Sequence, residues 1–192
     1  MPTLGEIVHI KAGYSFRSRI ERVPDGTIAV IQASDVPDSG FVAVDDLAHI
    51  EPAEGLGAEF VEPGDIVITT RGDSIRAAVV PATPRPAIIA APLLRCRVAN
   101  GHVMPEYLAW YLNQPKVEAT LTRSAEGTNI KMIRRAVLEA LEIDVPPFER
   151  QHIVVQLADL AEREHSLQSE LEIRTGQLLS AVMMQFAEGG AR

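Results

Sequence analysis

The stretch from Phe148 to Phe186 limits most strongly what this chain can fold into, because it contains no proline and only one glycine, Gly176. Its apolar residues recur about every 3.5 residues, as in a coiled-coil seam. Glu164 and either Arg174 or Thr175 interrupt them. The pattern predicts one amphipathic helix of about 38 residues, roughly 57 Å long at the α-helical rise. The predicted seam residues are Ile153, Leu157, Leu160, Leu167, Leu171, Leu178, Val182 and Phe186.

A helix of this length extends beyond a domain of about 150 residues, whose radius is near 15 Å. The sequence offers no second stretch long enough to cover the apolar stripe. We therefore expect a coiled coil with another chain, in which residues 147–192 form a dimerisation and spacer helix. The alternative is a helix that folds back on its own domain.

Residues 1–146 are expected to form a single domain of mixed α/β (α+β) class. Prolines at 81, 84, 86 and 92 separate short apolar runs, which indicates a twisted, largely antiparallel sheet and not a doubly wound fold. The predicted strands are 28–32, 66–70, 77–80, 87–91 and 94–98, with a short one at 142–145. The predicted short helices are 105–112, 115–121 and 132–138.

Several classes of protein are disfavoured by simple counts. No apolar run approaches the ~20 residues that span a bilayer, and the N-terminus MPTLGEIVHI lacks the features of a signal peptide. The single cysteine cannot form an internal disulfide, and the five histidines show no metal-ligand spacing. We expect a cytoplasmic protein without a metal, a cofactor or a membrane contact.

The charge is separated by sign along the chain. The formal net charge is -8, which argues against nucleic-acid binding. However, the ten acidic residues from Asp25 to Asp65 contain no Lys or Arg between them, whereas Arg71 to Arg97 holds five arginines and one acid. One surface is therefore expected to be basic while another repels DNA or docks a basic partner. The alternative is that the acidic block is simply a solvated face.

The segment from Asp144 to Phe148, DVPPF, differs by one inserted residue from the Asp-Pro-Pro-Phe signature of DNA amino-methyltransferases. In that signature the acid and the prolines are contiguous and form a rigid turn around a flipped base. Val145 moves the acid out of such a turn. No glycine-rich loop opens a nucleotide-binding helix either. The mechanical interpretation is better: two prolines end a strand, fix its exit direction and start the long helix.

Residues 142–160, EIDVPPFERQHIVVQLADL, resemble the hinge of type I restriction-modification specificity (S) subunits. There a short strand runs into a proline-rich segment and then a long helix. The other matching segments are 4–13, 30–35, 63–72, 127–131 and 175–186, in the family's order. Two departures stand out. A standard S subunit has two recognition domains and two helices, and here Arg150 and Phe148 replace residues that are often Glu and Leu.

The resemblance implies a non-catalytic half-subunit. In the family each recognition domain reads half of a bipartite DNA site. The two helices pack antiparallel and set the spacer, and methyltransferase subunits that modify adenine dock on them. We therefore expect a two-fold homodimer that binds double-stranded DNA and DNA adenine methyltransferase (M) subunits, with a restriction (R) subunit as a further candidate partner. The Met1 start and the family-like C-terminal end favour a natural half-subunit over a fragment.

Three polar segments are the candidate DNA contacts, because base edges and phosphates are read by Arg, Lys, Asn, Gln, Ser and Thr on loops. They follow a strand at 13–19, join two strands at 71–76, and precede the hinge at 127–131. The alternative for Arg17, Arg71 and Arg76 is an ion pair with the acidic block. The candidate residues are Ser15, Arg17, Arg19, Arg71, Ser74, Arg76, Thr128, Asn129 and Lys131.

Two rival functions remain open at this point. The first is an interaction protein that keeps the S-subunit shape but binds no DNA, which the net charge favours. The second is a stand-alone enzyme, which the missing cofactor loop disfavours.

Overall fold

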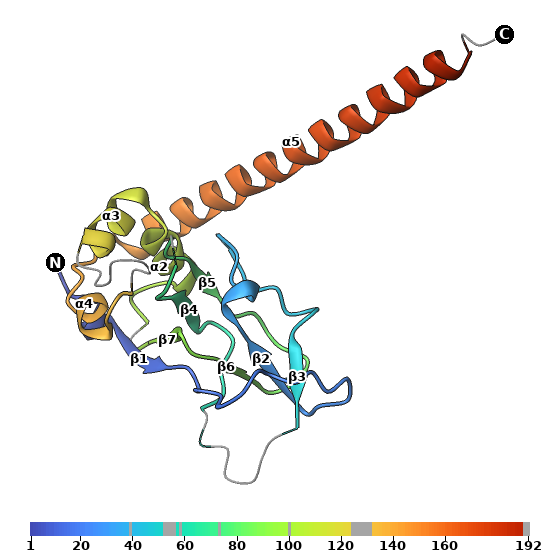
Figure 1. The fold of residues 1–192 in the computed structure, drawn as a ribbon. Helices are drawn as coiled ribbons and strands as arrows, with labels where there is room; N and C mark the ends of the chain where they lie inside the picture. The colour runs from blue at the N-terminus through green and yellow to red at the C-terminus, as the bar shows by residue number, and fades with distance from the viewer. Residues whose placement is uncertain are drawn as a thin grey trace. The chain divides into compact units, whose positions relative to one another are not determined.

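A computed structural model describes residues 1–38, 40–51, 57, 59–72, 74–99, 101–123 and 132–189 of the chain. It divides into two compact units, Met1–Val155 and Gln156–Arg192. The first unit holds the sheets and short helices, and the second holds most of one long helix (Figure 1).

Two sheets form the centre of the first unit (Figure 1). The larger sheet is antiparallel, in the order β1-β7-β4-β5, with strands Val8–Ala12, Leu93–Val98, Ile66–Thr69 and Ala77–Val79. The smaller sheet has the order β3-β2-β6, with strands Ala48–Ile50, Ile28–Ile31 and Ala87–Ile89. In it β2 pairs antiparallel with β3 and parallel with β6. The predicted α+β class with a largely antiparallel sheet is confirmed, and the strands divide into two sheets.

Short helices accompany the larger sheet. They are α1 (Leu4–Ile7), α2 (Pro105–Leu112), α3 (Pro115–Arg123) and α4 (Arg135–Glu139), and a 3-10 turn, η1 (Ala33–Asp35), follows β2. Leu108, Leu121 and Leu138 from three of these helices are almost fully buried in one cluster with Ile66 and other strand residues. A second cluster lies between the sheets, where Ile31, Val67 and Leu93 meet. Strands β2 and β4 are each buried along their whole length, as expected for strands covered on both faces.

Two sequence predictions near the hinge are wrong. The helix expected from Met132 begins at Arg135, because Met132 pairs with Arg71 and the Ile133 N–H donates to the Thr70 carbonyl. The strand expected at 142–145 is reduced to one bridge between Glu142 and Thr3. Prolines 146 and 147 follow directly and have no N–H to donate, so the ladder cannot continue.

Helix α5 runs from Phe148 to Gly189, 42 residues, which confirms the predicted long helix. Its length is about 63 Å at 1.5 Å per residue. All eight predicted seam residues are exposed, with exposed fractions from 39% at Val182 to 79% at Phe186. The apolar stripe is therefore available to a partner.

The first turn of α5 is fixed by Gln151, whose side chain is completely buried. Its Oε1 accepts the Met104 N–H at 2.8 Å, and its Nε2 donates to the carbonyls of His102 at 2.8 Å and Pro146 at 2.9 Å. Nearby, the Tyr107 hydroxyl donates to the Asp144 carbonyl at 2.8 Å. Asp144 therefore takes part in this hinge through its main chain.

Candidate nucleic-acid interface

Three loops meet at the turn formed by Ala90, Ala91 and Pro92, which joins β6 to β7. The loop that follows β1 reaches it at Tyr14, whose carbonyl accepts the Ala91 N–H at 2.9 Å. The end of β2 reaches it at Ile31, whose carbonyl accepts the Ala90 N–H at 2.9 Å. Two of the loops are thus tied to the turn by main-chain hydrogen bonds alone.

The connection between β4 and β5 joins the same group. The Thr70 hydroxyl donates to the Pro92 carbonyl at 2.6 Å, and the Arg76 guanidinium donates through Nη2 to the Ala33 carbonyl at 3.1 Å. Arg76 Nε also lies 3.9 Å from an Asp38 carboxylate oxygen. The ion pair with the acidic block, which the sequence left open for Arg76, is therefore present, although it is long and Asp38 is almost fully exposed.

The loop after β1, the segment after β2 and the turn at Ala90–Pro92 line a shallow hollow in the surface. Its lining includes Ser15, Ser18 and Arg19 from the first loop and Gln32 and Ser34 from the segment after β2. These side chains carry hydroxyl, amide and guanidinium groups, which are the groups that read base edges and phosphates. The structure thus brings Ser15 and Arg19 together with the segment after β2, whose Ala33 carbonyl accepts a hydrogen bond from Arg76.

The other described candidates do not line this hollow. Arg17, Arg71 and Ser74 are exposed, and Arg71 pairs through its backbone with Met132. Among the described residues, no carboxylate lies within ion-pair distance of Arg17, Arg19 or Arg71. The candidates Thr128, Asn129 and Lys131 lie outside the described residues.

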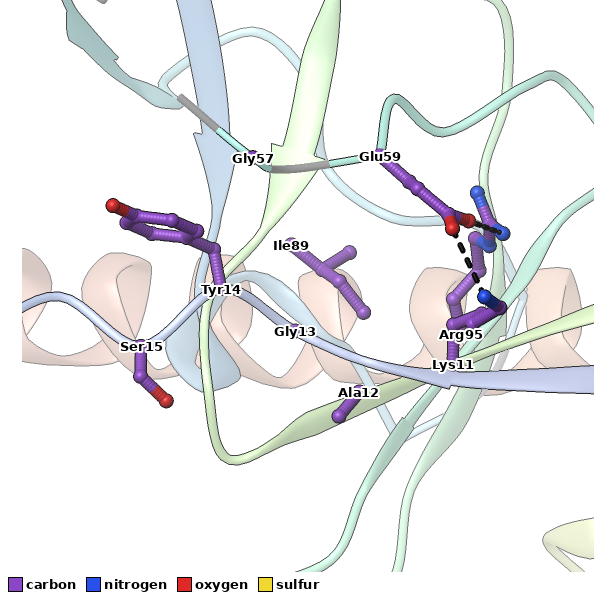
Figure 2. A pocket seen from close by; sticks show the side chains of 9 residues that line it. All are labelled: Lys11, Ala12, Gly13, Tyr14, Ser15, Gly57, Glu59, Ile89 and Arg95. Atoms are coloured by element: carbon purple, nitrogen blue, oxygen red, sulfur yellow. Dashed lines mark hydrogen bonds and ion pairs between the residues drawn. The ribbon is translucent and has the colours of Figure 1, made fainter. Parts of the chain in front are cut away.

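A second pocket is lined by the end of β1 and the start of the first loop, together with Glu59 and Arg95. Figure 2 shows Glu59 reaching between Lys11 and Arg95, while the Ser15 side chain points away from them. Glu59 lies 3.1 Å from the Lys11 ammonium and 2.7 Å from the Arg95 guanidinium. The pKa of Glu59 is lowered, mainly by the hydrogen bond from Lys11. Glu59 therefore pairs with both cations at once. Arg95 is buried and out of reach of a phosphate, whereas Lys11 is half exposed.

Arg97 is neutralised in the same way. It donates through Nε and Nη2 to the Asp65 carboxylate at 2.7 and 2.8 Å, and through Nη1 to Glu62 at 2.6 Å. Asp65 is only 1% exposed, and its hydrogen bonds with Arg97 raise the pKa of that guanidinium. Two arginines of the basic segment from Arg71 to Arg97 are thus held by carboxylates of the acidic block. Acidic and basic residues that are separated along the sequence are therefore paired in the fold.

Sequence reasoning missed Gln32 and Ser34 as members of the hollow. A signal was available, because both follow a buried strand directly, as Ser15 and Arg19 follow β1. It also missed Gln151, whose buried position follows from contacts with residues almost 50 positions away. Such contacts leave no periodic trace in the sequence.

Neither a membrane span nor a metal site is evident in the described part of the chain. No helix there combines the length and hydropathy needed to cross a bilayer. No three side chains of His, Cys, Asp or Glu among those residues are grouped closely enough to hold a metal ion.

The sequence profile of the type I restriction modification DNA specificity domain matches residues 1–172. Because the match covers most of the chain, the protein belongs to this family of specificity domains. No curated protein matches the chain.

Three solved structures that resemble the chain come from type I systems. A chain from a study of the assembly and conformational transition of the type I R-M system has a TM-score of 0.65 and 19% identity, over 91% of this chain and 40% of that chain. The HsdS subunit from Thermoanaerobacter tengcongensis gives 0.59 and 20%, over 84% and 37%. The S subunit from M. genitalium gives 0.53 and 18%, over 89% and 41%. The chain thus spans about two fifths of these relatives' length.

Proposed function

We propose that this chain is a half-sized DNA specificity subunit of a type I restriction-modification system. One copy reads one half of a bipartite site, and two copies pair through antiparallel α5 helices. The dimer scaffolds DNA adenine methyltransferase subunits in the cytoplasm, with a restriction subunit as an additional partner. The chain itself performs no chemistry and needs no cofactor.

The convergence of three polar loops on the turn at Ala90–Pro92 is the observation that carries this proposal. It presents Ser15, Arg19, Gln32 and Ser34 together on one surface, supported by two sheets. Binding residues on loops held by a rigid scaffold are the usual arrangement for recognition. Membership of a family of DNA specificity domains supports duplex DNA as what these loops bind.

The size of the chain supports the pairing. It spans about two fifths of each relative, so two copies supply about four fifths of such a chain. The exposed seam of α5 gives the copies a surface on which to meet, and a two-fold axis would place two identical recognition domains on one duplex.

The direct test is selection from a random double-stranded DNA library with the purified protein at low salt. We expect an enriched split site whose halves are inverted repeats. Arg17→Ala/Arg19→Ala should weaken binding and reduce the slope of log K against log salt by about 2. The control Lys116→Ala/Arg123→Ala removes the same charge from exposed positions on α3 and should leave binding unchanged.

The alternative is an interaction protein that keeps the shape and has no DNA binding of its own. The net charge of -8 and the use of Arg95 and Arg97 in internal ion pairs favour it. It predicts no enriched site and equal behaviour of both double variants, together with a stable complex with the methyltransferase subunits. That combination of results would replace the proposed function.

A further inference from the structure

Two charged side chains interrupt the apolar seam of α5. Successive residues of an α-helix are rotated by about 100°, so Glu164 and Arg174 fall on the same face as Leu160, Leu167 and Leu171. Both charged residues are exposed in the described chain. A charge that is buried in a helix seam without an opposite charge is costly. A helix that covers this face must therefore supply an acidic group for Arg174 and a basic group for Glu164.

We propose that a second copy of the chain supplies these opposite charges. The two α5 helices pack antiparallel, with the two-fold axis at the level of Ser169. Glu164 lies five residues before Ser169 and Arg174 lies five residues after it. In this alignment Glu164 of each copy faces Arg174 of the other, so the two interruptions cancel in two ion pairs. The inference rests on the homodimer of the proposed function and adds its alignment.

The same centre aligns the leucines of the seam. Leu167 and Leu171 lie two residues on either side of Ser169, and Leu160 and Leu178 lie nine residues on either side. Each therefore faces a leucine of the second copy. Farther out, Leu157 faces Ala181. Antiparallel coiled coils set the two kinds of core position against each other in this way. Toward the ends of the helix the match is less regular, because Ile153 faces Gln185, Val182 faces Gln156 and Phe186 faces His152.

Other alignments leave charges against leucine or against like charge. A shift of one heptad in one direction sets Glu164 against Leu167 and Arg174 against Leu157. The opposite shift sets Glu164 against Ala181 and Arg174 against Leu171. A parallel pair sets Glu164 against Glu164 and Arg174 against Arg174. Buried unpaired charges and like-charge contacts both disfavour these arrangements.

Neighbours within the helix complete the arrangement. The Arg174 guanidinium lies 2.5 Å from the Glu170 carboxylate, and the Gln168 side chain donates to Glu164 at 2.9 Å. Glu170 lies near its own symmetry mate at the centre, so the two copies bring two Glu170 and two Arg174 side chains together. Along the pair the order is Arg174, Glu170, Glu170, Arg174, so each glutamate keeps the arginine of its own helix beside it, which offsets part of the repulsion between the glutamates.

Charge reversal tests the ion pairs. Glu164→Arg and Arg174→Glu should each raise the dimer dissociation constant by about a hundredfold or more, as measured by analytical ultracentrifugation. The double variant Glu164→Arg/Arg174→Glu restores opposite charges across the pair and should recover most of the affinity. It keeps the repulsion that Arg174→Glu creates with Glu170 in the same helix, so recovery would come from contacts between copies. Failure to recover would overturn the ion pairs.

Cross-linking tests the alignment and direction. Gln168 occupies the flank of the seam at the centre, so Gln168→Cys should be joined to itself by a short bismaleimide. Ala161→Cys is the matched control one heptad away, where the facing residue is Thr175. It should not self-link efficiently, whereas a mixture of Ala161→Cys and Thr175→Cys should cross-link. The native Cys96 is buried, and burial raises the pKa of its thiol to about 12, which keeps it unreactive.

The outcomes separate this inference from the proposed function. A dimer that self-links through Ala161→Cys instead of Gln168→Cys would overturn the alignment and leave the specificity function standing. A monomer that still selects a DNA half-site would remove the pair while retaining DNA reading. Self-linking at Gln168 together with the charge-swap recovery is the supporting result.

Discussion

At the scale of single residues, two buried polar groups hold the recognition domain in shape. Asp65 is a buried carboxylate that depends on Arg97, and Gln151 is a buried amide that depends on main-chain partners. Buried polar groups contribute little net stability while they are satisfied, and their loss is costly because the partner stays behind unpaired. Substituting Gln151, or the Arg97 partner of Asp65, should therefore lower the free energy of unfolding.

Replacing Gln151 with leucine should destabilise the first unit by about 2 kcal/mol, because the Met104 N–H and two carbonyls lose their partner. Thermal unfolding followed by circular dichroism measures the change. Gln156→Leu is the control, since Gln156 is exposed on the same helix, and it should change stability by less than about 0.5 kcal/mol. Equal effects of both variants would show that the Gln151 contacts are unimportant.

Removing Arg97 should be more damaging, because the Asp65 carboxylate is left buried without its main partner. Arg97→Leu is expected to cost about 3 kcal/mol in denaturant unfolding. Adding Asp65→Asn removes the buried charge, so the double variant Asp65→Asn/Arg97→Leu should be more stable than Arg97→Leu alone. An additive loss in the double variant would contradict the ion pair as the cause.

At the scale of elements, the position of the first loop depends on a close backbone approach. A Cβ built on Gly13 would lie 2.7 Å from the Ala90 carbonyl carbon and 2.9 Å from the Ala91 nitrogen. Both are rigid main-chain atoms of the turn that gathers the loops. Any side chain at Gly13 must therefore push the end of β1 away from the turn, and the candidate interface would open.

Gly13→Ala should lower the unfolding midpoint and weaken DNA binding together, since the loop that carries Ser15 and Arg19 is displaced. Gly101→Ala is the control, because a Cβ at Gly101 meets no atom within 4 Å. Differential scanning fluorimetry and DNA-binding titrations on the two variants give the comparison. Normal DNA binding by a folded Gly13→Ala protein would show that the loops do not need the turn.

The sequence predicted these elements unevenly. The long helix was predictable because its period extends over about 11 turns. The buried strands β4 and β7 were predictable from short apolar runs between prolines. β3 and the start of α4 were not predicted, because both depend on pairing between distant residues, β3 with β2 and Met132 with Arg71. For the same reason the sequence suggested separate polar loops, and only the fold shows that a single turn gathers them.

At the scale of the whole molecule, the exposed seam of α5 predicts that seam substitutions change the oligomeric state. Leu160→Glu/Leu171→Glu puts charges into the seam and should convert a dimer into a monomer at micromolar concentration, because buried unpaired charges cost several kcal/mol. Light scattering coupled to gel filtration measures the mass. The control Ser166→Glu/Ser180→Glu adds the same charges on the opposite face of α5 and should stay dimeric. A wild-type monomer would contradict the pairing.

The hydrogen bonds that gather the loops of the proposed DNA-reading surface have a consequence for how such a protein changes. The bonds from Ala90 to Ile31 and from Ala91 to Tyr14 are made by main-chain atoms, so they are indifferent to the side chains around them. Substitutions at Ser15, Arg19, Gln32 or Ser34 can alter what the surface prefers while the framework keeps its geometry. New preferences can thus accumulate by single substitutions, each passing through a folded protein.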